Sequence, residues 1–150
     1  MENKVFFSII IPTYNRGHLI SKTIRSIIMQ NFTYYEIIIV DDGSTDNTED
    51  IVRPFLSKNI KYYKKNNAER GAARNYGTKL ANGDYVNWFD SDDLALPNHL
   101  TSAEFFCLQL NKPEIFHLAY QYNNPNGVLL RSVSSFPNIN NISLYLGNNS

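Results

Sequence analysis

Two isoleucine-rich runs constrain the fold of this chain more than any other feature of its sequence. Residues 6–11 read Phe-Phe-Ser-Ile-Ile-Ile, and residues 36–40 read Glu-Ile-Ile-Ile-Val. Neither run shows a regular alternation of apolar and polar residues, so each predicts a strand that is buried on both faces. Strands of that kind occur in parallel sheets whose two faces are covered by helices. The helical spacing of Ile20, Ile24, Ile27 and Ile28 between the two runs supports this interpretation.

The rest of the sequence continues the alternation of strand and helix. We expect strands at 6–11, 36–40, 60–63 and 84–89, and helices at about 18–30, from 46–49 onward, at 71–80 and at 97–110. The second helix would present its apolar face through Ile51, Val52, Phe55 and Leu56. Asn126-Gly127 predicts a hairpin of strands 115–122 and 128–133, and irregular structure is expected from residue 134. This order predicts an α/β fold with a doubly wound, mostly parallel sheet, right-handed crossovers and the hairpin at a mixed edge.

Length and composition narrow the class of protein. The chain has 150 residues and a formal net charge of zero, which indicates one domain over residues 1–150 and argues against a nucleic-acid binder. Cys107 is the only cysteine, so an internal disulfide framework and a cysteine metal site are excluded. We expect Cys107 and Trp88 to be buried. No apolar stretch approaches the ~20 residues of a membrane span.

Polar and acidic residues follow three of the four predicted parallel strands. Pro12-Thr13-Tyr14-Asn15 follow the first, Asp41-Asp42-Gly43-Ser44 the second, and Asp90-Ser91-Asp92-Asp93 the fourth. Because ligands bind outside the carboxyl ends of the strands in an open parallel sheet, these segments predict a binding site. Clustered carboxylates repel one another, and a hard divalent cation, Mg²⁺ or Mn²⁺, would offset that repulsion.

The acids at these strand ends are not equivalent. Adjacent residues in a strand point to opposite faces, so only one of Asp41 and Asp42 should face a ligand, and a structural role is favoured for Asp41. Asp90 and Asp92 are favoured as functional because they lie two residues apart at the end of a buried strand. Asp46 and Glu49 are expected to be solvated acids or helix caps, without a ligand.

No glycine-rich phosphate loop follows the first strand, neither a GxGxxG motif nor a P-loop. Phosphates would therefore be held by a metal and by cations from elsewhere in the chain. Arg70 and Arg74 lie four residues apart at the start of the third helix and would share one face of it. A solvated basic face is an equally good interpretation of either arginine. Tyr14 stands at a strand end, where it could stack on a nucleobase.

Five short motifs occur in order along the chain. They are Ser8-Ile-Ile-Ile-Pro-Thr-Tyr-Asn-Arg16, Val40-Asp-Asp-Gly-Ser-Thr-Asp46, Gly71-Ala-Ala-Arg-Asn75, Asn82-Gly-Asp-Tyr85 and Asp90-Ser-Asp-Asp93. Together they resemble the family 2 glycosyltransferases of the GT-A fold, over residues from about 5 to 135. Each motif is weak alone, whereas all five in register are highly specific. The resemblance implies a sugar transferase that uses a nucleotide-diphosphate sugar and a divalent metal.

Carried over by position, the resemblance assigns the nucleoside site to the ends of the first two strands. Pro12, Thr13, Tyr14 and Asn15 would contact the nucleotide sugar, with Tyr14 stacked on the base. Asp42 would accept a hydrogen bond from the base, as from uracil N3–H, which favours a UDP-sugar.

The resemblance assigns the remaining donor contacts to the end of the fourth strand. Asp90, Ser91 and Asp92 are similar to the DxD motif of the family. Asp90 would approach the ribose or the sugar, and Asp92 would bind the metal that bridges the two phosphates. Arg74 resembles a basic residue near the diphosphate or the donor sugar.

The general base of the reaction is not identifiable in the sequence. The family inverts the anomeric carbon, which requires a carboxylate that deprotonates the acceptor, in the carboxyl-terminal half. Beyond Asp93 the only acids are Glu104 and Glu114, and neither sits where the family places its base. Two interpretations stay open. The chain is a metal-assisted glycosyltransferase, or it is a nucleotide-sugar binding fragment without turnover, truncated in the acceptor and base region.

Other classes fit less well. A phosphorylation-receiver domain needs acids after the first strand and a lysine late in the sheet, and no lysine follows Lys112. A nucleotidyltransferase needs the missing glycine-rich loop.

The resemblance to the family 2 glycosyltransferases implies a saccharide, lipid-linked or protein acceptor, as in cell-wall or polysaccharide biosynthesis. It also implies a cytoplasmic location, with peripheral attachment at the inner membrane face as a variant.

Overall fold

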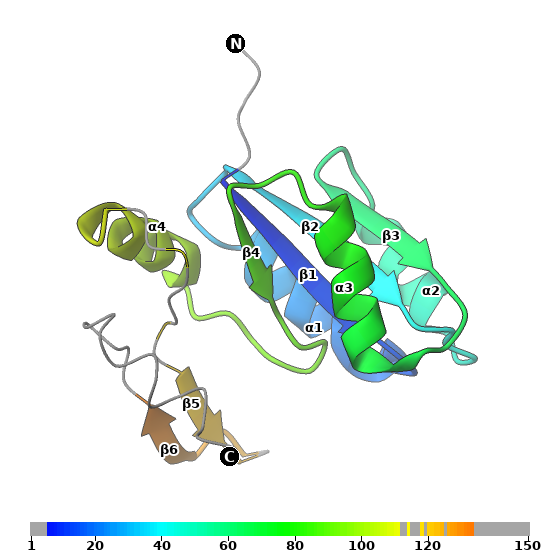
Figure 1. Cartoon of the computed structure of the whole chain (residues 1–150). Helices are drawn as coiled ribbons and strands as arrows, with labels where there is room; N and C mark the ends of the chain where they lie inside the picture. The colour runs from blue at the N-terminus through cyan, green and yellow to red at the C-terminus, as the bar shows by residue number, and fades with distance from the viewer. Residues whose placement is uncertain (1–5, 112–113, 115–117, 119, 125, 134–150) are drawn as a thin grey trace, which may run out of the picture. The chain divides into compact units, whose positions relative to one another are not determined.

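The isoleucine-rich strands form the centre of a four-stranded parallel sheet (Figure 1). The strands are β1 (Phe7–Thr13), β2 (Tyr35–Asp41), β3 (Ile60–Lys64) and β4 (Tyr85–Trp88), in the order β3-β2-β1-β4. Every pair of neighbours is parallel, and Ile10 of β1 lies in register with Ile38 of β2. The central strands β1 and β2 are buried along nearly their whole length, as the apolar runs predict.

The computed structural model describes residues 6–111, 114, 118, 120–124 and 126–133. The chain divides into two compact units, residues 1–98 and residues 99–150, and each is considered by itself. The parallel sheet and its helices belong to the first unit. The prediction of a single domain over residues 1–150 stays a prediction.

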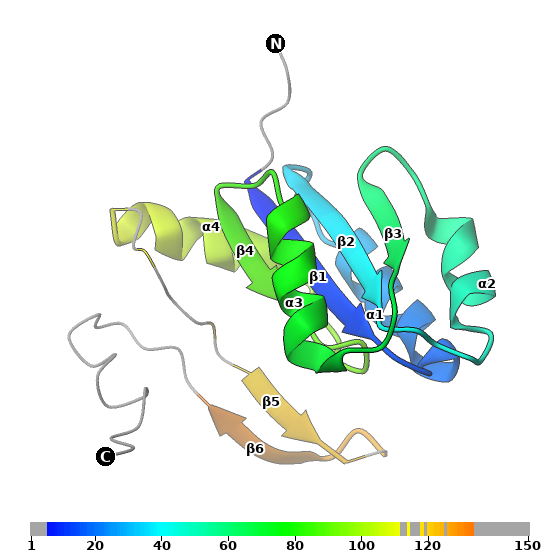
Figure 2. The same cartoon turned by 45° about the vertical axis from the view of Figure 1, so that its right-hand side comes forward.

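Helices cover both faces of the sheet. The first unit contains α1 (Gly17–Ile28), α2 (Thr48–Val52), which continues into the 3₁₀ turn η1 (Arg53–Phe55), and α3 (Glu69–Leu80). Helices α1 and α2 lie on one face and α3 lies on the other (Figures 1 and 2). The predicted doubly wound α/β fold is therefore confirmed.

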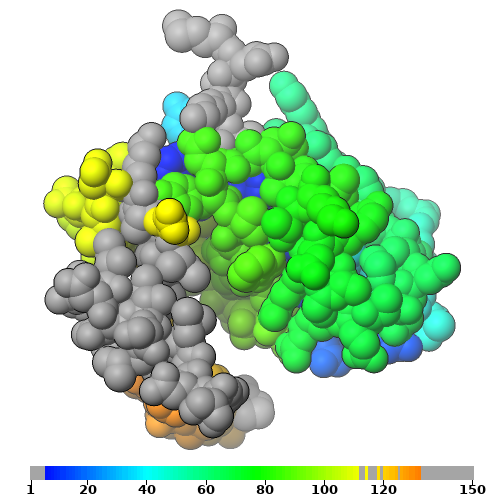
Figure 3. Space-filling model, viewed as in Figure 1, coloured from blue at the N-terminus to red at the C-terminus, as the bar shows by residue number. Residues whose placement is uncertain are grey.

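Packing of α3 explains why it stays close to the sheet. Ile10, Ile38, Val40 and Ala73 form one buried cluster between α3 and the strands. A Cβ atom added at Gly77 would lie 2.4 Å from Cγ2 of Ile10, so only glycine permits this approach. In the space-filling view, residues of about 60–95 (green) make up most of this face of the first unit, and β1 is almost hidden (Figure 3).

The strand order fixes where a ligand can bind. From β1 the chain passes to β2 and β3 on one side, and it then returns through α3 to place β4 on the other side of β1. The order of strands therefore reverses between β1 and β4. In doubly wound sheets, a crevice opens at such a point outside the carboxyl ends of the strands.

Two predictions about individual residues are wrong. Helix α2 ends at Val52, and Leu56 of its predicted apolar face is exposed. Pro54 explains the early end, because proline lacks an N–H and disfavours helix in the residue before it. Trp88 is 54% exposed, although we expected it in the core. It lies on β4, the edge strand of the sheet, where its Nε1–H donates to Oγ1 of Thr78 at 3.1 Å.

The second unit contains α4 (His99–Gln109), β5 (Tyr120–Asn123) and β6 (Leu129–Val133). Strands β5 and β6 are antiparallel, which confirms the hairpin, and Gly127 adopts the left-handed φ of 80° that its turn requires. Among the described residues they form a two-stranded sheet of their own, and the predicted mixed edge of the parallel sheet stays a prediction. Cys107 of α4 is buried, as expected. Residues 115–117 and 119 of the predicted strand, and residues 134–150, lie outside the described residues.

Candidate functional site

A cavity of about 310 Å³ lies at the carboxyl ends of β1, β2 and β4, on the side where α3 begins. Seven residues predicted to contact a nucleotide sugar or its metal line it: Pro12, Thr13, Tyr14, Asp42, Asp90, Ser91 and Asp92. Its volume lies at the lower end of the range of small-molecule sites. The topology thus brings together three segments that are far apart in the sequence.

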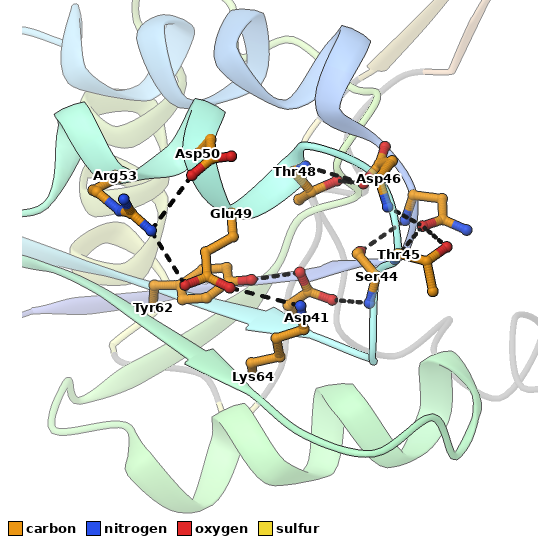
Figure 4. Close-up of polar contacts among 11 residues, drawn as sticks. Asp41, Ser44, Thr45, Asp46, Thr48, Glu49, Asp50, Arg53, Tyr62 and Lys64 are labelled. Carbon is orange, nitrogen blue, oxygen red and sulfur yellow. Dashed lines mark hydrogen bonds and ion pairs between the residues drawn. The ribbon is translucent and has the colours of Figure 1, made fainter.

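Asp41 and Asp42 point in opposite directions, as the strand geometry predicts. Asp41 is fully buried, and its carboxylate accepts the backbone N–H of Ser44 at 2.6 Å and the hydroxyl of Tyr62. Figure 4 shows Asp41 turned toward these two residues, on the side of the sheet where Glu49 lies. Burial raises the pKa of Tyr62, and the hydrogen bond to Asp41 raises it further. Asp41 therefore has a structural role, whereas Asp42 lines the cavity.

Asp42 is held by the segment between β3 and α3. Both of its carboxylate oxygens accept the backbone N–H of Ala68, each at 3.1 Å. The Nζ ammonium of Lys65 donates to Oδ1 of the same carboxylate. Only 5% of the Asp42 side chain is exposed, so its charge is offset mainly by this lysine.

Asn15 does not line the cavity. It adopts a left-handed φ of 51°, and its side-chain oxygen accepts the backbone N–H of Thr45 at 2.8 Å. Its own backbone N–H donates to Oγ of Ser44 at 2.8 Å. Asn15 thus joins the segment after β1 to the segment after β2, and its predicted contact with a nucleotide sugar stays a prediction.

Asp46 and Glu49 behave as the structural acids that we expected. Asp46 accepts the backbone N–H of Gly17 at 3.1 Å and that of Thr48 at 3.0 Å, so it caps the first turns of α1 and α2. Burial by itself would raise the pKa of Asp46, but the hydrogen bonds from Thr48 and Gly17 outweigh it and lower the pKa. Glu49 forms surface ion pairs with Arg53 and Lys64, each at 3.6 Å (Figure 4).

The segment after β4 is fixed from two sides. Ser91 is buried, and its carbonyl accepts the hydroxyl of Thr23 on α1 at 2.9 Å. Asp90 forms ion pairs with Arg74 at 2.6 Å and with Arg70 at 3.5 Å. The two arginines therefore share one face of α3, as their spacing predicts. Arg74 does not line the cavity itself and reaches it only through Asp90.

Carboxylates accumulate at this segment. Asp92 is about half exposed and lies 3.9 Å from Nε of Arg16. The pKa of Asp93 is raised, first by partial burial of its carboxyl and then by the charges of Asp90 and Asp92. The charges of Asp90 and Asp92 thus disfavour a further negative charge on Asp93. A cation at this end of the sheet would relieve that repulsion.

Two buried polar atoms at the site have no hydrogen-bond partner. They are Oγ1 of Thr13 and Nε of Arg74, and they are the only such side-chain atoms in the described part of the chain. Thr13 is 3% exposed and lines the cavity. A buried polar group without a partner costs about 1–3 kcal/mol, so a molecule or water in the cavity that satisfies the Thr13 hydroxyl would be stabilised there.

Five further residues line the cavity: Arg16, Asn67, Glu69, Arg70 and Ala73. Of these, the sequence predicts only Arg70 as a possible contact, as a cation for phosphates. Asn67 follows β3, so the strand-end rule that selected the other segments would have found it. Glu69 adopts a left-handed φ of 71°, which is uncommon outside glycine and is not visible in the sequence.

No helix within the described ranges is both long and apolar enough to cross a lipid bilayer.

Similar proteins in two organisms align with most of this chain. An uncharacterized glycosyltransferase of Mycoplasma pneumoniae is 43% identical over 65% of this chain and 35% of its own length. One from Rickettsia conorii is 37% identical over 89% of this chain and 22% of its own length. The chain thus spans about a third or less of the length of these two relatives.

Two solved structures are similar to this chain in fold and sequence. TarS of Staphylococcus aureus (residues 1–349), crystallised with UDP-GlcNAc, is 35% identical with a TM-score of 0.67, over 70% of this chain and 32% of that one. The mannosyltransferase PcManGT of Pyrobaculum calidifontis, solved with GDP-Man and Mn²⁺, is 27% identical with a TM-score of 0.62, over 80% of this chain and 36% of that one. Residues 8–104 match the sequence profile of glycosyl transferase family 2. With motifs, fold and sequence in agreement, this chain belongs to the family 2 glycosyltransferases.

Proposed function

We propose that the cavity binds a nucleotide-diphosphate sugar, with a UDP-sugar favoured, and that the protein transfers the sugar to a saccharide, lipid-linked or protein acceptor with inversion. The observation that carries the proposal is the convergence of Thr13, Tyr14, Asp42 and Asp90 on one cavity at the switch point of the sheet. The similarity to TarS, whose structure contains UDP-GlcNAc, supports the choice of nucleotide. A cytoplasmic location and a role in polysaccharide synthesis belong to the same proposal.

The proposed roles follow from the position of each side chain. Tyr14 is 47% exposed at the cavity, so one face of its ring is available to a nucleobase. The Thr13 hydroxyl has an unused donor and would hydrogen-bond the nucleoside. Asp42 would accept an N–H of the base. Arg74, with Nε unpartnered and Nη2 on Asp90, would face the diphosphate or the sugar.

A divalent metal fits the residues at the end of β4. Asp92 lines the cavity and offers carboxylate oxygens, the ligands that Mg²⁺ and Mn²⁺ prefer. The described residues contain no group of three or more acids, histidines or cysteines arranged to hold an ion alone. Asp92 would therefore share the metal with phosphate oxygens and water, as is usual for these ions. The bound metal would neutralise charge on the leaving nucleoside diphosphate.

A thermal-shift panel of nucleotide sugars tests the donor site. We expect a UDP-sugar with Mn²⁺ to raise the melting temperature more than either component alone. A ligand present at 1,000 times its dissociation constant stabilises the folded state by about 4 kcal/mol, which corresponds to a rise of roughly 8–16 °C in a chain of this size. The panel includes UDP-, GDP-, CDP- and dTDP-sugars at millimolar concentration, with EDTA as the control. The absence of a shift with every member would contradict the donor site.

A nucleotide-sugar binding fragment without turnover is the second candidate. It is favoured by the short span of the chain, which covers 35% and 22% of the lengths of the two relatives, and by the sequence given beyond Asp93, whose only acids are Glu104 and Glu114. We expect this chain alone to release UDP from UDP-GlcNAc slowly, with or without sugar acceptors, even at saturating donor. A coupled UDP-release assay measures this rate. Rapid acceptor-dependent release would reject the fragment interpretation and would direct the search for the base to those two glutamates.

A further inference from the structure

Lys65 ties the end of β3 to the acid that lines the cavity. Its Nζ ammonium contacts Oδ1 of Asp42 and also the carbonyl of Asn66 at 2.6 Å. Its backbone N–H donates to the carbonyl of Asp41 at 2.9 Å, which continues the pairing of β3 with β2. Only 19% of the side chain is exposed. Lys65 is therefore held at both its backbone and its ammonium.

The hydrogen bonds of Asp42 leave one of its oxygens partly free. Oδ1 receives the Lys65 ammonium and the N–H of Ala68, while Oδ2 receives only the shared N–H of Ala68. Each carboxylate oxygen has two lone pairs, so Oδ2 retains one acceptor position. Asp42 lines the cavity, so its carboxylate lies beside the space that a bound molecule would fill.

The backbone around Asp42 leaves little freedom for a different arrangement. A Cβ atom at Gly43 would lie 3.1 Å from N of Asn67 and 3.3 Å from O of Lys65, so the two segments are in close contact. Burial of a carboxylate is costly unless hydrogen bonds or a nearby cation compensate its loss of hydration. Lys65 supplies that cation from within the same contact.

We propose that Lys65 is a positioning residue for nucleobase recognition, which rests on the proposed donor site. By holding Oδ1, it presents Oδ2 of Asp42 as a fixed acceptor for a ring N–H. Uracil N3–H and guanine N1–H can donate to this oxygen. The corresponding ring nitrogens of cytosine and adenine carry lone pairs and are repelled by a carboxylate. The substrate class is thus a nucleoside diphosphate whose base has a ring N–H beside a carbonyl.

Dissociation constants of UDP and CDP, measured by calorimetry with Mn²⁺, test this role. The wild-type chain is expected to prefer UDP. In Lys65→Met, UDP should bind about tenfold more weakly and CDP less than about twofold more weakly, because only UDP uses the positioned oxygen. Lys65→Gln can donate a hydrogen bond to Asp42 but carries no charge. Its affinity for UDP should lie between those of the wild type and Lys65→Met. Lys64→Met is the matched control, since Lys64 pairs with Glu49 away from the cavity.

The outcomes separate this inference from the donor site. Equal losses of UDP and CDP in Lys65→Met and Lys65→Gln would overturn it, because a purely structural lysine would affect both nucleotides alike. A wild-type chain that binds UDP without preferring it over CDP would also overturn it, while leaving the donor site intact. A wild-type chain that binds no nucleotide at all would overturn both. Circular dichroism checks that each variant folds. If Lys65→Met does not fold, the affinities of Lys65→Gln for UDP and CDP decide the question.

Discussion

Replacing Asp92 with alanine is expected to remove the Mn²⁺-dependent part of nucleotide-sugar binding, with a loss of at least about 100-fold in affinity for UDP-GlcNAc. The estimate is conservative, because removing a group that merely supports a metal ligand already costs about 10–100-fold in metal affinity or activity. Asp92 lines the cavity and pairs only distantly with Arg16, at 3.9 Å. Its loss should therefore leave the stability of the unliganded protein nearly unchanged, as for other exposed ion pairs.

The measurement compares the melting temperature with UDP-GlcNAc, with and without Mn²⁺, for the wild type and the variant. Asp93→Ala is the matched control, since Asp93 is the adjacent acid and does not line the cavity. The control should keep the metal-dependent shift. If Asp92→Ala retains the full shift, the proposed metal ligand is wrong. If Asp93→Ala loses it while Asp92→Ala does not, the ligand is the neighbouring acid.

Replacing Glu36 with alanine is expected to cost about 3 kcal/mol of folding free energy, because the buried hydroxyl of Ser8 and the partly buried N–H of Asn82 would lose their partner. Glu36 is 4% exposed and lies at the amino end of β2, opposite the cavity end of the sheet. Its carboxylate accepts the hydroxyl of Ser8 at 2.8 Å and the backbone N–H of Asn82 at 2.7 Å. The nearest cation is Lys61, whose Nζ lies 3.8 Å away.

This carboxylate organises the turn that delivers β4 to the edge of the sheet. Oγ of Ser8 in turn accepts the backbone N–H of Gly83 at 2.8 Å, so the turn is joined to both β1 and β2. Urea unfolding measures the free-energy change. Glu49→Ala is the control, since its ion pairs are on the surface and should contribute less than about 1 kcal/mol. A loss for Glu36→Ala no larger than that of the control would contradict the proposed role of the buried carboxylate.

Much of the fold follows from local sequence patterns. The unbroken isoleucine runs predict buried parallel strands, and the spacing of Ile20, Ile24 and Ile27 predicts α1, because burial of each side chain depends on the period of the element. Helix α2 illustrates the limit of that reasoning. Its apolar spacing continues to Leu56, but Pro54 ends the helix, since backbone chemistry at one residue overrides the apolar pattern around it.

The candidate site was predictable where strand geometry governs it. The carboxyl ends of parallel strands meet at one edge of the sheet, so Tyr14, Asp42 and Asp92 could be brought together from their positions alone. The edge position of Trp88 could not be predicted in the same way. Whether a strand is central or at an edge depends on the order of strands, and residues 85–88 have the apolar character that either place allows.

The sequence by itself determined the class of fold, the end of the sheet where the candidate site lies and the acids that gather there, because these depend on periodicity and on chain direction. Only the tertiary structure decided which partner each charge has. It places Lys65 on Asp42, Arg74 on Asp90, and Ser8 with Asn82 on Glu36. The two members of each pair lie 16 to 46 residues apart in the sequence, on different segments of the fold. Their geometry is fixed by packing of the helices against the sheet, which no local pattern encodes.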